Sequence, residues 1–425
     1  MKGNCISKAD KLIISLISSG TELGSVEIND IDWDQIFRTA LANRLDGIIY
    51  DSLDRSGIFE SLPEKVRKKF EESYRQTVIN TRIYLEMAAG IFRAFSSGGI
   101  ELIVLRGLAL GLDFYSRPYL RPFTDLDLLI GKEDIPVAKK ILGDFGFVPL
   151  PGILPNRYFE KHHLHLSFKD PKRNIIVELH WALDHPYTLY TVDYAELLAG
   201  KMKASFEGFT IPVLSPEDRL ITLCLHLVKH CPFLHLLNEE DDLSSLLLKG
   251  RWLLWLLDIH LLLTATGESL NGESIRGKAE KWGIHKQVAI CLSAVGRVFQ
   301  THLPFQYQRW TEKHRISTLE ARLYGMQLAR LRGEKRSGRT GQFLFSLRPD
   351  SIFRPIRALD LVKYLFPPPE YLRRKYQTGG ISLIIAYPRH TISGAIRLTR
   401  NLVALIYYRA MKEEIDHYPT IRVDT

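Results

Sequence analysis

The chain has 425 residues, of which 45% are hydrophobic and 25% are charged, a globular balance that argues against intrinsic disorder. Its four cysteines are scattered without a CxxC spacing, which argues against a disulfide framework or a cysteine zinc site and indicates a reduced, cytoplasmic protein. The net charge of +9 is concentrated in residues 301–425, where 22 basic and 10 acidic side chains give +12 and leave −3 for the rest. That region either faces an anionic partner or is an ordinary solvated surface.

Residues 1–99 are predicted to be helical. The chain starts with a short apolar stretch that is interrupted by serines and lacks a small-residue cleavage signal, which indicates an amphipathic helix and not a signal peptide. A longer helix is expected over residues 64–95, and the sequence from Ser96 to Gly99 ends it. No window holds about 18 uninterrupted apolar residues, so no membrane span is expected.

The pattern changes at residue 100, where short apolar runs alternate with helical segments. The run IELIVL is a candidate for a buried strand that ends in a turn at Arg106-Gly107. Further strands are expected at TDLDLLIG, HHLHLSF and NIIVELHW, and helices at LALGLDFYS and KEDIPVAKKILGDFGF. Residues 100–185 are therefore expected to form a compact α/β unit with a small mixed sheet.

Helical periodicity returns after this unit. Pro216 and the acidic residues that follow it fit a helix start, and RWLLWLLDIHLLLTAT reads as another helix. The expected fold class is α+β or α/β, with the sheet core embedded between helical regions. The expected organisation is an N-terminal helical region 1–99, the core 100–185, a helical domain 186–332 and a basic C-terminal extension 333–425 with a terminal helix.

The most informative segment is the acidic strand TDLDLLI. Alternate residues of a strand point to the same face, so Asp125 and Asp127 project together while Leu126 and Leu128 enter the opposite side. Two carboxylates that lie so near each other repel, and a divalent cation between them relieves the repulsion. Mg²⁺ suits such a site because it prefers oxygen ligands and keeps positions for water or phosphate oxygens. A DxD spacing alone is a weak signal, since an exposed polar strand face shows it too.

An ordered set of motifs along the chain resembles the uncharacterised nucleotidyltransferase family of the polymerase-β superfamily. That family shows a turn in which a basic residue precedes glycine, an arginine in the following loop, and a strand with two alternating aspartates. A second strand then carries an acidic residue two positions before a His-Trp pair. Helical motifs and a C-terminal proline segment follow. The matching segments here are LIVLRG, TDLDLLI, ELHW, SPED with a later HLVKH, WLLD and LFPPPEYLRRKY.

The resemblance implies a metal site of three carboxylates. Asp125 and Asp127 would bind Mg²⁺ or Mn²⁺, and Glu178 of the ELHW motif would be the third ligand. In the superfamily, the third acid helps to position or deprotonate the attacking hydroxyl. We therefore expect Asp125, Asp127 and Glu178 to be the catalytic residues and the metal ligands.

The resemblance also implies a site for the triphosphate at the turn Arg106-Gly107, with Arg121 of the following loop as a further anion-binding candidate. A structural salt bridge is the equal alternative for Arg121. Arginine replaces the more usual lysine at 106, which keeps the charge but changes the donor geometry. Leu108 stands where the superfamily has a serine, so a serine donor to phosphate is absent.

Four histidines are candidates for substrate contact: His163, His180, His226 and His230. His180 either orients Glu178 or contacts substrate, and a hydrogen-bonded core histidine is the alternative. His163 and His165 share a strand face, but no third zinc ligand is evident, so contact of His163 with the active site is favoured over zinc. His226 and His230 share a helix face, where they contact substrate or pack against a neighbouring helix.

The expected function is Mg²⁺-dependent transfer of a nucleoside monophosphate from a nucleoside triphosphate (NTP) to an acceptor. The resemblance favours a small molecule, a sugar or a peptide as that acceptor. The alternative is a nucleotide-binding or regulatory protein of the same fold with reduced catalysis. Nucleic-acid binding is a third possibility, but the basic region shows no clear nucleic-acid-binding motif.

The basic C-terminal part leaves two interpretations open. Over residues 371–412, basic side chains alternate with the apolar runs ISLIIAY and NLVALIYY. Docking of the terminal helix on the helical domain is favoured, because its apolar residues fit one buried stripe. The alternative is weak contact with an anionic membrane surface, which would place a cytoplasmic protein at the inner membrane face.

Overall fold

The computed structural model describes residues 8–18, 31–150, 164–183, 192–206, 209–231, 251–301 and 386–392, with single positions between them. The chain divides into two compact units, residues 1–150 with 157–315 and residues 151–156 with 316–425. All elements named below belong to the first unit. His163 and most of residues 371–412 lie outside the described residues, so the expectations for them remain predictions.

The N-terminal region is helical, as predicted. Its helices are α1 (Lys8–Ser18), α2 (Trp33–Ala42), α3 (Asp46–Arg55) and α4 (Glu64–Ser97), with the short 3-10 helix η2 (Phe59–Ser61) before α4. In α4, Ala88, Ile91 and Phe95 recur at helical spacing and are fully buried, which holds this face of the helix against the sheet. The helix ends where Gly99 adopts a left-handed φ of 74°.

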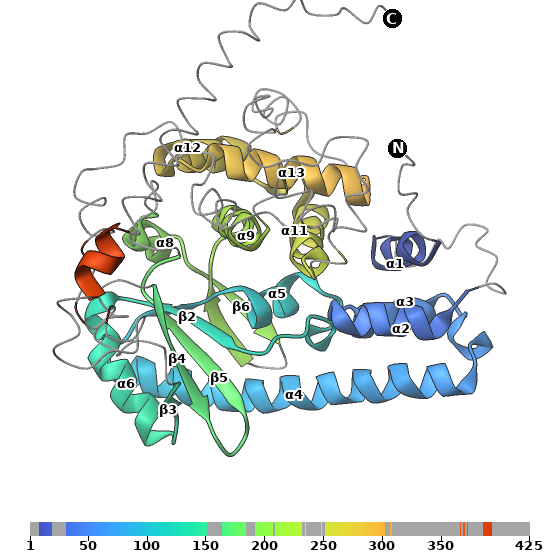
Figure 1. Ribbon diagram of the computed structural model, residues 1–425, viewed down its shortest axis with the longest axis horizontal. Helices are drawn as coiled ribbons and strands as arrows, with labels where there is room; N and C mark the ends of the chain where they lie inside the picture. Colours follow the sequence, from blue (N-terminus) through green and yellow to red (C-terminus); the bar gives the residue numbers. More distant parts are fainter. Residues whose placement is uncertain are drawn as a thin grey trace, which may run out of the picture. The chain divides into compact units, whose positions relative to one another are not determined.

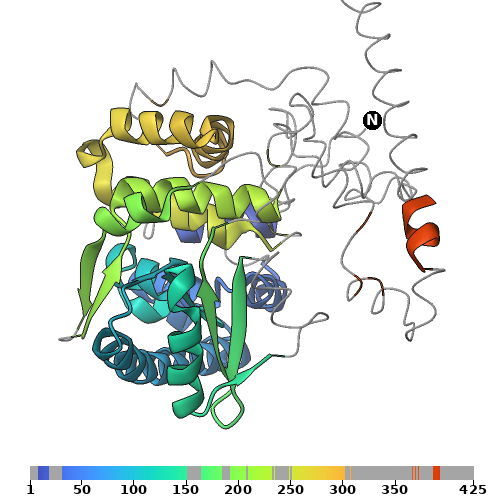
Figure 2. The ribbon, with the colours of Figure 1, turned by 90° about the vertical axis from the view of Figure 1, so that its left-hand side faces the viewer.

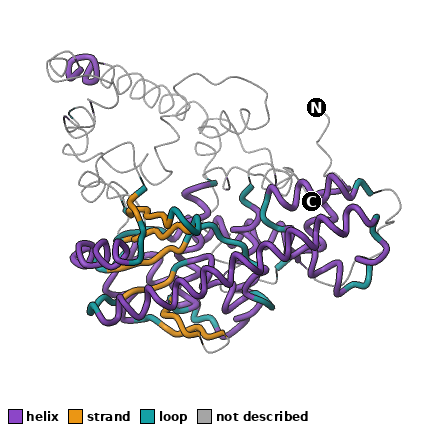
Figure 3. The backbone as a smooth tube through the Cα atoms, turned by 90° about the horizontal axis from the view of Figure 1, so that it is seen from below, coloured by secondary structure: helices purple, strands orange, loops and turns teal. Residues whose placement is uncertain are grey.

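Seven strands form one mixed sheet, and Figure 3 shows them in orange among the helices. The strands are β1 (Leu102–Val104), β2 (Leu126–Ile130), β3 (Val148–Pro149), β4 (His165–Asp170), β5 (Ile175–His180), β6 (Met202–Phe206) and β7 (Phe209–Val213). Their order in the sheet is β3-β4-β5-β2-β1-β7-β6. The central strand β2 runs parallel to β5 and antiparallel to β1, so the acidic strand lies inside the sheet.

The hairpin of β6 and β7 was not predicted from the sequence. β7 pairs in parallel with β1, and β6 pairs with β7, so the sheet extends beyond the unit expected at residues 100–185. Pro212 and a polar outer face weaken the strand signal of this segment. Ile211 and Val213 are nevertheless fully buried in the sheet core, which explains why the hairpin docks there.

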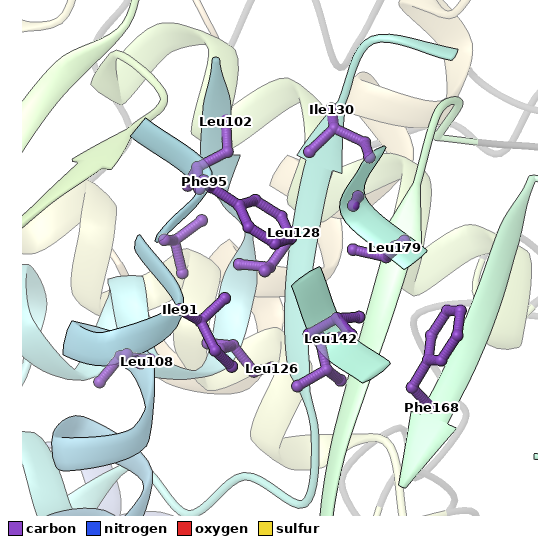
Figure 4. Close-up of a cluster of buried hydrophobic side chains, with 14 of the residues drawn as sticks. Ile91, Phe95, Leu102, Leu108, Leu126, Leu128, Ile130, Leu142, Phe168 and Leu179 are labelled. Carbon is purple, nitrogen blue, oxygen red and sulfur yellow. The ribbon is translucent and has the colours of Figure 1, made fainter. Parts of the chain in front are cut away.

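One face of the sheet forms the main hydrophobic core with α4 and α6 (Ile135–Asp144). Leu126, Leu128 and Ile130 of β2 point into this core, where Figure 4 shows them beside Ile91 and Phe95 of α4. Leu128 is 0% exposed. Burial of one such side chain stabilises the fold by about 1.5–3 kcal/mol. The alternation along β2 therefore fixes which way the intervening acidic side chains face.

Helices also cover the opposite side of the sheet. They are α8 (Tyr194–Ala199), α9 (Pro216–His230), α11 (Leu253–Thr266), α12 (Gly272–Trp282) and α13 (His285–Phe299). Figures 1 and 2 show α9 and α13 across the sheet from α4. Ser215 caps α9 by accepting a hydrogen bond from the Asp218 amide, which confirms the predicted helix start. The architecture is α+β, with a mixed sheet between helical regions.

Short connecting helices complete the first unit. They are α5 (Arg106–Phe114), η3 (Pro118–Leu120), η4 (Lys132–Asp134) and η6 (Gly267–Ser269). Within the described part of the chain, no helix combines the length and apolar character that a membrane crossing requires.

Candidate active site

Three carboxylates meet on the sheet face opposite the main core. The parallel pairing of β2 and β5 sets Asp127 beside Glu178, and Asp125 directly precedes β2. One carboxylate oxygen from each of Asp125, Asp127 and Glu178 lies within 4.8 Å of the others. The strand register thus brings together the three acids that the sequence singles out, although they are up to 53 positions apart in the chain.

The turn between β1 and α5 lies against Asp127. The Leu105 amide donates to the Asp127 carbonyl oxygen at 2.9 Å, which ties the turn to β2. Arg106 and Gly107 then adopt left-handed φ angles of 42° and 21°, and such a φ is uncommon for an arginine. A Cβ atom at position 107 would lie 2.9 Å from Cβ of Phe123, so the turn requires glycine there.

Arg106 is held between the acidic strand and α9. Its Nε donates to Oδ2 of Asp127 at 3.0 Å, and its Nη1 contacts Nδ1 of His226. The Arg106 side chain is 19% exposed, so this ion pair is largely shielded from solvent. The residue expected to bind phosphate thus lies next to the carboxylates, where it already neutralises one of them.

His180 bridges two of the carboxylates from β5. Its Nε2 lies 2.9 Å from Oδ1 of Asp127 and 3.3 Å from Oε2 of Glu178. The other Glu178 oxygen accepts a hydrogen bond from the Ser167 hydroxyl at 2.9 Å and lies 3.7 Å from Nε2 of His165. Of the three interpretations left open for His180, the geometry supports a buried, hydrogen-bonded histidine that also orients Glu178.

The carboxylates differ in their electrostatic surroundings. Burial, together with the charges of Asp127 and Glu178, raises the pKa of Asp125 to about 6. Burial also acts to raise the pKa of Asp127, but Arg106 and His180 outweigh it and hold that pKa well below its usual range. For Glu178, burial acts to raise the pKa, but the hydrogen bond from His180 and the charges of His165 and His180 together outweigh it and lower the pKa. Asp125 is therefore the carboxylate whose charge the nearby cations, Arg106 and Arg44, compensate least.

His226 and His230 of α9 form an aromatic cluster with Trp255 of α11. The His226 ring lies 4.6 Å from the His230 ring and 4.8 Å from the Trp255 ring, measured between centroids. Burial and the positive charge of Arg106 hold the pKa of His226 well below its ordinary value, so its imidazole is neutral and can accept from the guanidinium. Through Arg106, α9 is thereby linked to the acidic strand.

Arg121 lies in a buried ion pair. Its Nε and Nη2 each donate to an oxygen of Asp258 on α11 at 2.7 Å, and the Tyr115 hydroxyl donates to the same carboxylate at 2.6 Å. The third nitrogen, Nη1, donates to the carbonyl oxygen of Pro122. This geometry supports the structural alternative for Arg121, since its guanidinium is engaged by groups that fix the loop before β2 to the helical region.

Sequence reasoning missed two residues of the site region. His165 appeared only in a zinc interpretation that lacked a third ligand, yet it lies beside Glu178 and His180. Trp255, which received no role from the sequence, is half-buried beside the two histidines of α9. The alternation of HHLHLSF gave a usable signal for His165, because the pairing of β4 with β5 sets it opposite His180.

The carboxylate group fits a hard divalent cation. All of its donor atoms are oxygens, and the mutual repulsion that raises the Asp125 pKa is what a bound cation would relieve. Neighbouring protein donors already orient Glu178 and Asp127. The residues present therefore match the requirements of Mg²⁺ or Mn²⁺ without rearrangement of the strands.

Comparison with known proteins identifies the family. A search of the curated proteins found no match. The family model described as "Uncharacterised nucleotidyltransferase" matches residues 29–300, a range that contains the whole sheet, the three carboxylates and the helices α9, α11 and α13. On this evidence, the chain belongs to the uncharacterised nucleotidyltransferase family.

Proposed function

We propose that this protein transfers a nucleoside monophosphate from an NTP to an acceptor and releases pyrophosphate. The observation that carries the proposal is the meeting of Asp125, Asp127 and Glu178 within 4.8 Å, next to the glycine turn at Arg106-Gly107. Membership of a nucleotidyltransferase family supports the same reaction class. The acceptor is proposed to be a small molecule, a sugar or a peptide, as the resemblance suggests.

Asp125, Asp127 and Glu178 are the proposed ligands of Mg²⁺ or Mn²⁺. When bound, the cation neutralises the charge of the triphosphate and of the carboxylates. Asp125 has the most to gain, because Arg106 and Arg44 only partly offset the burial and the charges that raise its pKa. Asp127 stays ionised over the whole physiological range, so it offers a permanent anionic ligand.

The turn before α5 is the proposed phosphate site. Arg106 supplies a planar guanidinium whose N–H groups can pair with two phosphate oxygens. Gly107 has no Cβ, so the backbone amides of the turn can approach phosphate closely. His226 holds the Arg106 side chain from the other end and thereby limits its freedom.

Glu178 is the proposed group that orients the acceptor hydroxyl. That hydroxyl oxygen forms a bond to the α-phosphorus while the bond from the α-phosphorus to the leaving pyrophosphate oxygen breaks. Because the pKa of Glu178 is lowered, it is a weak base, so it accepts a hydrogen bond from the hydroxyl and the proton passes to solvent. His180 and Ser167 keep the Glu178 carboxylate in place.

The test is NTP-dependent release of pyrophosphate with a panel of acceptors. Asp127→Asn removes a charged ligand at nearly constant size and should abolish the release, while an unchanged circular dichroism spectrum shows that the fold persists. Arg276→Ala changes an exposed pair on α12 and serves as the matched control. Wild-type turnover in both Asp125→Asn and Asp127→Asn would place the reaction elsewhere.

The second candidate is a nucleotide-binding or regulatory protein with reduced catalysis. The observation that favours it is the ion pair of Arg106 with Asp127, together with Leu108 in place of the usual serine. Isothermal titration with Mg-NTP separates the two candidates. Tight binding of NTP without pyrophosphate release across the acceptor panel supports the regulatory protein.

Cytoplasmic action is part of the proposal, and docking of the basic C-terminal helix on the protein is its favoured arrangement. Contact with an anionic membrane is the alternative, and co-sedimentation with anionic liposomes tests it. Binding that fades with added salt and disappears on deletion of residues 381–425 supports the membrane contact. Absence of sedimentation at low salt supports the docked helix.

A further inference from the structure

Two histidines flank Glu178 on the site face of the sheet. The antiparallel pairing of β4 with β5 sets His165 opposite His180 and Ser167 opposite Glu178. Because opposite and alternate residues share a face, both imidazoles and the carboxylate project to the same side. One donor atom from each of His165, Glu178 and His180 lies within 4.8 Å of the others.

The spacing of these donors matches that around a small metal ion. Oε1 of Glu178 lies 3.7 Å from Nε2 of His165, and Oε2 lies 3.3 Å from Nε2 of His180. Four ligands at about 2.0–2.1 Å around a tetrahedral ion are themselves about 3.3–3.4 Å apart. The two imidazole rings, with centroids 4.8 Å apart, therefore need only small movements to share one ion with the carboxylate.

The surroundings of His180 also indicate a ligand. The residue is 3% exposed, and its Nδ1 is buried without a hydrogen-bond partner among the described residues. Among the described residues, the ring therefore makes its polar contacts through Nε2, the atom that would bind an ion. Ser167 donates to Glu178 from the same strand as His165, and such an outer hydrogen bond typically orients a metal ligand.

We propose that His165, Glu178 and His180 form a second cation site that binds a divalent transition metal, with Zn²⁺ or Co²⁺ as the matching class. Imidazole nitrogen suits these ions, whereas Mg²⁺ prefers an oxygen site such as Asp125, Asp127 and Glu178. Three protein ligands leave a fourth position open, as in catalytic zinc sites. The proposal goes beyond the transferase reaction and does not depend on it.

Glu178 belongs to both sites, which makes it the link between them. A carboxylate can bridge two ions, and an ion at the histidines would replace the hydrogen bond of His180 to Asp127. The second ion would thereby fix the Glu178 side chain from the side of β4. The oxygen-ligand site would keep Asp125 and Asp127, so the two sites can be emptied separately.

The test measures Co²⁺ binding to the full-length, chelator-stripped protein in the absence of nucleotide. Millimolar Mg²⁺ is added to fill the oxygen-ligand site, and equilibrium dialysis counts the Co²⁺ that remains. One equivalent of Co²⁺ with strong visible absorption, which indicates nitrogen ligands and low coordination number, is expected. His165→Gln and His180→Gln should each weaken this binding about tenfold or more.

Three further variants define the controls. Asp125→Asn should still bind the Co²⁺ that millimolar Mg²⁺ does not displace, whereas Glu178→Gln should lose it. His285→Gln, at the start of α13, should leave this Co²⁺ binding unchanged. Circular dichroism checks that each variant folds, and His165 is the safer of the two histidines because it is half-buried at 23% exposure. Complete displacement of Co²⁺ by Mg²⁺, or equal binding in wild type and the folded histidine variants, would overturn the proposal. Since no nucleotide is present, failure of the transferase reaction would not produce either result.

Discussion

Nε of Arg106 lies 3.0 Å from Oδ2 of Asp127, so the proposed phosphate-binding cation neutralises a proposed metal ligand. The guanidinium thus acts as an internal counter-ion in a group of three carboxylates. A divalent cation at Asp127 and a triphosphate at Arg106 would each weaken this ion pair. The pairing therefore couples the two binding events, because whichever ligand arrives first releases the group that the other needs.

Removal of the Arg106 charge should change the affinities for metal and for nucleotide in opposite directions. Arg106→Ala should raise the affinity for Mn²⁺ in the absence of nucleotide, because no cation competes for Asp127. It should also weaken Mg-NTP binding by about 10- to 100-fold, in line with loss of one to two charge-assisted hydrogen bonds. Arg106→Lys should weaken NTP binding less, since it keeps the charge but not the planar fork. Isothermal titration measures both affinities.

Arg276→Ala, which removes an exposed cation from α12, is the control and should change neither affinity. Unchanged NTP affinity in both Arg106 variants would remove this residue from the nucleotide site. A fall in Mn²⁺ affinity would contradict the competition between the guanidinium and the metal.

Asp125 should give the metal-free protein a distinctive pH dependence. Its pKa rises from 3.8 to about 6 in the folded protein, so between these values the folded state binds more protons than the unfolded state. The contribution of this group to stability is therefore greatest at acid pH and falls as pH rises from about 4 to 6. Asp125→Asn cannot ionise, so its stability relative to wild type should increase by about 1–3 kcal/mol across this window.

Urea unfolding of both proteins with a chelator present, at several pH values, measures this difference. Asp144→Asn, an exposed carboxylate at the end of α6, is the matched control. Saturating Mg²⁺ should reverse the order, because only the wild-type site has its full set of charged ligands. A stability difference that does not change with pH would show that Asp125 titrates normally.

Gly107→Ala should damage the phosphate turn more than the fold. The new Cβ atom would lie 2.9 Å from the Phe123 side chain, and the alanine would have to adopt a φ near 21°. We expect a loss of about 1–3 kcal/mol in unfolding free energy and a fall of about tenfold or more in Mg-NTP affinity. Gly143→Ala is the control, since a Cβ there meets nothing within 4 Å on helix α6. Equal NTP affinity in both variants would argue against close approach of phosphate to this turn.

Much of the site could be predicted because it depends on strand alternation. The pattern of β2 alone places Asp125 and Asp127 on the face opposite Leu128, and the structure has this arrangement. The ELHW motif marks Glu178, but only the parallel register of β5 with β2 shows that it faces Asp127. Local pattern gives the direction of a side chain within its own strand, whereas the partner depends on sheet order.

The remaining features depend on contacts between distant segments. Arg121 meets Asp258, which is 137 positions away, and no local pattern distinguishes that pairing from an anion site. The hairpin that contains Ile211 is short and includes a proline, so its place beside β1 follows from core packing and not from its own propensity. His165 needed the β4–β5 register before its partner could be identified.

The buried pair of Arg121 and Asp258 should be a determinant of stability and not of nucleotide affinity. Their side chains are 5% and 0% exposed, so replacement of one partner leaves the other charged and uncompensated. Asp258→Asn should therefore lower the unfolding free energy by about 3–5 kcal/mol, and the double variant Arg121→Met/Asp258→Leu should recover part of this loss. Arg276→Ala breaks an ion pair whose side chains are 52% and 72% exposed, and it should change stability by only about 0–1 kcal/mol.

Chemical unfolding gives the stabilities, and titration of the folded Arg121→Met protein gives its Mg-NTP affinity. Because the guanidinium is engaged by Asp258 and Pro122, that affinity should equal the wild-type value. A large fall in NTP affinity with little change in stability would instead assign Arg121 to the nucleotide site.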